Sequence, residues 1–226
     1  MSIVKIIIGY IFISAIIGSI FLLSFKLNSL ISRKADKMWI DTTYILSFIS
    51  LLIVLIFKIF YKEEFSIIGG KSILSMKVLV QMFIAAFVAA GLASLAKPEH
   101  HKSTLKAQIL SGMAMEIPMR GLVQNLFVIL GATAVLFHSI TLSIVLTTIF
   151  WVQFILIQEI MTKRTLSSKA VLDSIASMWF SVWVGVIYLT TGSMIVAMIT
   201  HALERWFAYM IRKKKSSMQN TESELY

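Results

Sequence analysis

The chain has 226 residues, of which 58% are apolar and only 14% are charged, and it contains no Cys. A soluble domain carries nearly twice that charged share, so the composition excludes a soluble globular enzyme, a disordered chain and a disulfide-stapled secreted domain. The net charge of +10 comes from 21 Lys and Arg against 11 Asp and Glu; in so apolar a chain it indicates basic cytoplasmic loops and contact with anionic lipid, and nucleic acid is not an expected partner.

Apolar segments follow one another along the chain, each long enough to cross a bilayer as a helix, which takes about 20 residues. They cover residues 4–25, 39–57, 73–96, 107–131, 139–158, 172–190 and 193–211. Because the segments are continuous rather than alternating, a strand barrel is not expected. The sequence therefore predicts an all-α fold, a polytopic transmembrane helix bundle of about seven spans, with residues 1–211 as a single domain.

The basic residues predict the orientation of this bundle. Fourteen of the 21 Lys and Arg lie in links 26–38, 97–106 and 159–171 and in the tail that begins at residue 212. With seven spans these segments share one side, which the positive-inside rule places in the cytoplasm. We therefore expect a multi-pass protein of the cell membrane with a cytoplasmic C-terminus and an outside N-terminus. The tail 212–226 is basic and then polar, and we expect its polar end to be disordered.

The span 107–131 contains charged residues, which are costly at membrane depth and usually face a protein or water-filled interior. Glu116, Arg120 and Gln124 are spaced at i, i+4 and i+8, so they share one helix face. Glu before Arg is the favourable order for a helical ion pair. Pro118 removes one backbone hydrogen bond and is expected to free a carbonyl near the pair. A purely structural pair that joins the bundle is the competing interpretation.

The span 193–211 carries His201 and Arg205 on one face by their i, i+4 spacing, with Glu204 beside them. Glu116 lies nine residues inside its span, about 14 Å, and His201 lies ten residues inside its own, about 15 Å. Two side chains at one depth on different helices can meet. We therefore predict a polar centre made of Glu116, Arg120 and His201, with Arg205 as a further candidate; a structural histidine is the alternative.

The motifs around these residues resemble the CPBP family, also called Abi, of CAAX-protease and bacteriocin-processing membrane proteins. The resemblance covers roughly residues 105–208. It rests on the segment Met115-Glu116-Ile117-Pro118-Met119-Arg120-Gly121, and on a closing segment with Gly185, the turn Thr191-Gly192-Ser193 and His201. Active relatives are pictured as using a glutamate-activated water to attack a peptide carbonyl inside the membrane, while His and Asn side chains hold the water and the developing oxyanion.

Three positions depart from the family pattern. Met115 stands where the first Glu of the Glu-Glu pair is expected, Phe154 where a His follows Phe150, and Arg205 where an Asn closes the last motif. A thioether cannot act as a base, and a phenyl ring neither donates nor accepts a proton. One Glu and one His also fall short of the usual three protein ligands of a catalytic metal, so we predict no metal and no cofactor.

These departures leave three functions open. The first is a non-proteolytic bacterial member that binds or regulates a membrane protein or peptide; the resemblance links such members to bacteriocin immunity, signalling and cell-envelope control. The second is an active intramembrane endopeptidase of CAAX-protease type, with Glu116 as base, His201 as its partner and Arg205 supplying charge to an oxyanion. The third is a transporter or channel, for which the chain lacks the internal repeat typical of that class.

Overall fold

A computed structural model describes residues 2–34, 42–60, 75–95, 104–133, 139–163 and 167–223. All regular elements in these ranges are helical, which confirms the all-α prediction there. The helices are α1 (Ser2–Lys34), α2 (Thr42–Phe60), α3 (Met76–Ala93), α4 (Leu105–Glu116), the π-helix η1 (Ile117–Gln124), α5 (Asn125–Thr133), α6 (Ser139–Lys163), α7 (Ser168–Thr191) and α8 (Met194–Ser223). The elements α4, η1 and α5 follow one another without a break.

Several helices are long and apolar enough to cross a membrane. Five meet this description by length and composition, over Ile3–Asn28, Thr42–Phe60, Met76–Ala93, Leu105–Ala132 and Ser168–Thr191. Helix α6 has a shorter apolar stretch, Thr141–Ile157. The seventh predicted span lies in α8, whose His201, Glu204 and Arg205 reduce its mean hydropathy. The helices are thus those of a membrane-embedded chain, and the count of seven spans stays a prediction.

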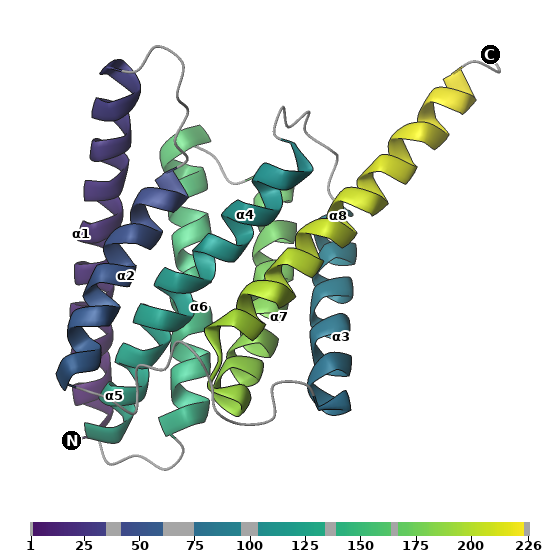
Figure 1. Cartoon of the computed structure of the whole chain (residues 1–226). Helices are drawn as coiled ribbons and strands as arrows, with labels where there is room; N and C mark the ends of the chain where they lie inside the picture. Colours follow the sequence, from purple (N-terminus) through teal and green to yellow (C-terminus); the bar gives the residue numbers. More distant parts are fainter. Residues whose placement is uncertain are drawn as a thin grey trace.

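The bundle is arranged around the continuous helix α4–η1–α5 (Figure 1). Helix α4 packs against α8, α5 against α6, and η1 against α2, while α3 packs against α7 and α8. In Figure 1, α1 and α3 therefore lie at opposite edges, and the two termini lie at opposite ends of the bundle. In their most apolar windows, 56% of the residues of α4–α5 are buried against 11% of α1, so the central helix is far more enclosed than α1.

The outer helices expose large apolar side chains to the surroundings. Exposed Ile, Leu, Val and Phe residues run along α1, α2 and α3, among them Ile8, Phe12, Phe48, Ile56 and Phe87. A soluble monomer does not leave apolar side chains exposed along whole helices. Lipid tails cover such a surface at no hydrophobic cost, which agrees with a membrane-embedded chain.

The polar C-terminal segment does not behave as the sequence predicts. Helix α8 continues to Ser223, so the expectation that the polar end after Lys215 is disordered is wrong for residues 216–223; residues 224–226 lie outside the described ranges. No Gly or Pro interrupts the sequence after Met194, and Lys215 Nζ donates a 2.5 Å hydrogen bond to the carbonyl of Ser94 at the C-terminal end of α3. A cation at that position is favoured by the helix dipole.

Pro118 changes the helix geometry beside Glu116. Without an N–H, Pro118 cannot donate the α-helical hydrogen bond to the carbonyl of Ala114, and the π-helix η1 begins here. The hydroxyl of Ser47 on α2 lies 2.6 Å from the Ala114 carbonyl and 2.7 Å from that of Thr43. The freed carbonyl that the sequence predicts is therefore that of Ala114. It accepts from the backbone N–H of Ile117, and the Ser47 hydroxyl of the neighbouring helix lies within hydrogen-bond distance of it.

Replacing Ser47 with Ala should lower the free energy of unfolding by about 1 kcal/mol, because the Ala114 carbonyl loses a buried donor. The matched control is Ser19→Ala, whose hydroxyl donates to the Ala15 carbonyl of its own helix, and we expect it to change stability by less than about 0.5 kcal/mol. Denaturant unfolding of purified protein in detergent, followed by circular dichroism, measures both. Equal effects would show that Ser47 does not satisfy the freed carbonyl.

Candidate functional site: a buried Glu–Arg–His network

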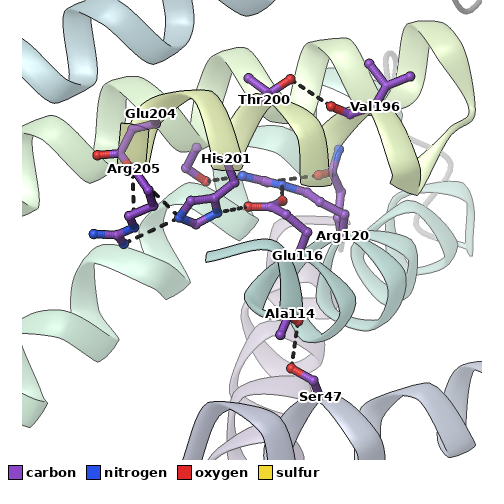
Figure 2. A network of polar contacts seen from close by, with 11 residues as sticks. Ser47, Ala114, Glu116, Arg120, Val196, Thr200, His201, Glu204 and Arg205 are labelled. Carbon is purple, nitrogen blue, oxygen red and sulfur yellow. Dashed lines mark hydrogen bonds and ion pairs between the residues drawn. The ribbon is translucent and has the colours of Figure 1, made fainter. Parts of the chain in front are cut away.

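Glu116 is the last residue of α4 and is only 2% exposed. Its Oε1 atom lies 2.6 Å from Nδ1 of His201 on α8, and its Oε2 atom accepts a hydrogen bond of 3.2 Å from Nε of Arg120. Figure 2 shows both contacts converging on the one carboxylate. The chain thus brings Glu116, Arg120 and His201 together, and each carboxylate oxygen has a partner.

The guanidinium of Arg120 extends the network into α7. Its Nη1 donates to Oε1 of Gln124 at 3.0 Å, and its Nη2 donates to the hydroxyl of Ser181 at 3.1 Å. The amide of Gln124 in turn donates to the backbone carbonyl of Gly185 at 3.2 Å. A planar group with fixed donor directions is suited to such a task, since each donor selects one partner. The charged pair on α4 and η1 is therefore held in place by α7.

His201 connects the buried pair to the surface. Phe180 of α7 packs edge-on against the imidazole, with ring centroids 4.8 Å apart. On the Nε2 side lie Nη2 of Arg205 at 3.4 Å and a carboxylate oxygen of Glu204 at 3.9 Å. Nε of Arg205 also lies 3.2 Å from Oε2 of Glu204, and the Arg205 side chain is 41% exposed. The polar contacts thus continue from exposed Arg205 through His201 to buried Glu116.

Gly112 makes the close contact between α4 and α8 possible. A Cβ atom at this position would lie 2.8 Å from Cδ2 of His201 and 3.0 Å from Cγ of Arg205. Any side chain would therefore push α8 away from α4 and stretch the contact between Glu116 and His201. Sequence reasoning missed Gly112; the available signal was a glycine one turn before Glu116 on the same helix face.

Other buried polar residues adjoin the network and were also missed. Thr148 of α6 lies 3.3 Å from the Ser181 hydroxyl. Asn125 donates to the hydroxyl of Tyr188 at 2.9 Å and to the carbonyl of Gly121 at 3.0 Å. Ser and Thr residues are common in membrane helices as packing residues, so their presence alone does not separate the site from the rest of the bundle.

The residues that depart from the family pattern occupy different surroundings. Met115 packs against the apolar core cluster to which α1, α2, η1, α5 and α6 contribute. Phe154 packs edge-on against Phe21 of α1, with ring centroids 4.3 Å apart. The α6 side chain that contacts the polar network is Thr148, six residues earlier. Its hydroxyl can donate and accept a hydrogen bond but is no substitute for an imidazole as a proton carrier.

In chemical terms the site is an internally paired network. Both oxygens of Glu116 already have a partner, so neither is free to accept a proton from water. The carboxylate also lies almost completely inside the bundle. Among the residues that the structure describes, no group of three or more His, Cys, Asp or Glu could hold a metal ion. Catalytic roles for Glu116, Arg120, His201 and Arg205 stay predictions.

Comparison of the chain with protein-family models, with curated proteins and with solved structures gives no match. The fold and the site by themselves define a helical, membrane-embedded protein with a buried Glu–Arg–His network. The resemblance to the CPBP family rests on the sequence motifs alone.

Proposed function

We propose that the protein is a multi-pass bacterial membrane protein, similar to the CPBP family, that binds or regulates a membrane protein or peptide without cutting it. The observation that carries this proposal is the pairing of both Glu116 oxygens within a 2% exposed side chain. A general base must lie within hydrogen-bond reach of the proton that it removes. Here the carboxylate is occupied by Arg120 and His201, so it favours a structural role.

The same network suits a scaffold. Arg120 and its partners link the central helix to α7, and His201 links it to α8. A fully satisfied polar network inside a bundle fixes one arrangement of the helices, because any other arrangement leaves buried charges without partners. A partner protein or peptide would then recognise a rigid helical surface. Bacteriocin immunity, control of signalling and control of cell-envelope enzymes are the processes that fit such a role.

Charge supports the proposed setting in the cell membrane. Lys213, Lys214 and Lys215 are exposed near the end of α8, and Lys106 is exposed in the first turn of α4. Such basic residues beside membrane helices attract anionic lipid headgroups. We propose a cytoplasmic C-terminus and an outside N-terminus on the positive-inside rule.

An intramembrane endopeptidase of CAAX-protease type is the second candidate. It is favoured by the 2.6 Å contact between Glu116 and His201, which resembles a base held by an orienting partner. Arg205 would supply positive charge to an oxyanion, as it lies 3.4 Å from His201 and is partly exposed. This function requires Arg120 to release Glu116 when a substrate enters.

Glu116→Ala and His201→Ala in lipid-reconstituted protein separate the two candidates. We expect the native chain to leave a reporter peptide uncut, because its Glu116 carboxylate is already paired. Both variants should leave the peptide uncut as well. Folded variants should at the same time lose most co-purification of the membrane partner, because the scaffold has loosened. Peptide cleavage by mass spectrometry, with pull-down from native membranes, measures both effects. Ser19→Ala is the control, since its hydroxyl donates to the Ala15 carbonyl within α1, away from the network.

Cleavage by the native chain that both substitutions abolish would overturn the scaffold proposal. A partner peptide that is trimmed in cells only while this gene is intact would point the same way. Co-purification that survives in every folded variant would show that the network does not shape the partner surface.

A further inference from the structure

His201 lies between two carboxylates, one on each side of the imidazole. Its Nδ1 atom faces Oε1 of Glu116 at 2.6 Å, and its Nε2 atom lies 3.9 Å from Oε2 of Glu204. Figure 2 shows Glu204 and Arg205 on the side of the ring away from Glu116. In the described part of the chain, the charged groups around this ring are Glu116, with Arg120 behind it, and the two neighbours on α8. Helix α7 contributes the uncharged ring of Phe180.

The partners of the imidazole assign the position of its proton. The Glu116 carboxylate also accepts from Arg120, so it is ionised and can only accept, and Nδ1 is therefore the donor. A neutral imidazole that donates through Nδ1 has a bare lone pair at Nε2. Nη2 of Arg205 lies 3.4 Å from that atom, and a guanidinium can only donate. The contacts thus fit a neutral ring with Arg205 as the donor to Nε2.

Glu204 is less well paired than Glu116. Its Oε2 atom is buried and receives no hydrogen bond, although Nε of Arg205 lies 3.2 Å away. An ionised oxygen that is removed from water and has no donor is costly. Nε2 of His201 becomes a donor to this oxygen once the ring carries a second proton. The buried acceptor for that proton is therefore already in place.

Charge balance favours an exchange of partners when the ring is protonated. With a neutral ring, the carboxylates of Glu116 and Glu204 balance the guanidinium groups of Arg120 and Arg205. A second ring proton places an imidazolium 3.4 Å from Nη2 of Arg205, where like charges repel and both groups can only donate. Departure of Arg205 restores the balance, because the charge on His201 replaces that of Arg205 beside Glu204.

Arg205 has a second partner within reach. Its side chain is 41% exposed, and Asp173 on α7 lies near enough for the two charges to interact. We infer that His201 is a proton-binding switch: the neutral ring holds Arg205 at Nε2, and the protonated ring donates to Glu204 and releases Arg205 toward Asp173 and the surface. The inference goes beyond the proposed function and does not rest on it, since a scaffold and a protease would both contain this exchange.

Nitrogen NMR of the lipid-reconstituted chain, labelled with 15N-histidine, distinguishes bare from protonated ring nitrogens. The chain has four His, and the signals lost in His201→Gln are those of His201. At about pH 8 we expect a protonated Nδ1 and a bare Nε2, and at about pH 5 two protonated nitrogens, since imidazole changes its charge in this range. A neutral ring protonated at Nε2, or the same signals at both pH values, would overturn the inference.

Two substitutions beside the ring should move this change in opposite directions. Glu204→Gln removes the acceptor of the protonated ring, so it should weaken proton binding by about tenfold. Arg205→Gln removes a like charge, so it should strengthen proton binding by about tenfold. Arg212→Gln is the control, because this cation lies eleven residues beyond His201, about 16 Å along α8. Shifts of the same sign, or shifts no larger than that of the control, would contradict the exchange.

Release of Arg205 is measured with an arginine-specific dicarbonyl reagent and mass spectrometry. The ratio of modified Arg205 to modified Arg212 cancels the pH dependence of the reagent itself. Between the same two pH values, we expect this ratio to rise severalfold on acidification of the native chain and to stay constant in His201→Gln. A constant ratio in the native chain would show that Arg205 stays on the ring, and an equal rise in His201→Gln would show that another group releases it.

Discussion

Arg120→Ala should lower the free energy of unfolding by about 3–5 kcal/mol, the cost of breaking a buried ion pair on one side. The substitution leaves the Glu116 carboxylate with His201 alone and removes the donors to Gln124 and Ser181. Gln124 and Ser181 are buried, so water cannot replace the lost hydrogen bonds without opening the bundle. Denaturant unfolding in mild detergent, followed by circular dichroism, gives the change.

The matched control is Arg205→Ala. Arg205 also pairs with a glutamate, Glu204 at 3.2 Å, yet its side chain is 41% exposed. Solvent screening weakens the stabilisation that such a pair provides, and we expect the free energy of unfolding to fall by less than about 1 kcal/mol. If the two substitutions cost the same, the network around Arg120 is not the buried, fully paired arrangement described above.

Gly112→Ala should cost about 1–3 kcal/mol, because the new methyl group would overlap His201 and the Arg205 stem. The clash separates α4 from α8, which also lengthens the contact between Glu116 and His201. The thermal midpoint of the purified protein should fall accordingly. The substitution tests the close approach of the two helices without removing any polar group.

Gly91→Ala on α3 is the control for this change, since nothing lies within 4 Å of the position that a Cβ would occupy. Alanine is favoured over glycine inside a helix by about 1 kcal/mol, so the expected change has the opposite sign. A fall in stability of equal size at both positions would mean that the Gly112 effect is not caused by the contact with α8.

Much of the site could be predicted because its first part lies on one helix. The helical period places Glu116, Arg120 and Gln124 on one face, and their hydrogen bonds follow that order. Depth within two apolar spans also predicted that His201 is able to reach Glu116, and the two atoms lie 2.6 Å apart. These predictions needed only spacing along the chain and the thickness of a bilayer.

Other features could not be predicted, because they depend on which helices lie side by side. Ser181 and the Gly185 carbonyl complete the network only because α7 packs beside η1, and Thr148 joins it from α6. Motif spacing pointed to Phe154 on that helix, yet its ring faces α1.

The sequence alone determined that this is an apolar, helical chain with a Glu–Arg pair in one span and a histidine at the same depth in another. Those features follow from local periodicity, which a helix converts directly into geometry. Only the tertiary structure decided that both carboxylate oxygens are paired and that Gly112 allows α4 and α8 to touch. The reason is physical: each contact between helices depends on how all the helices pack together, and no single segment encodes that packing.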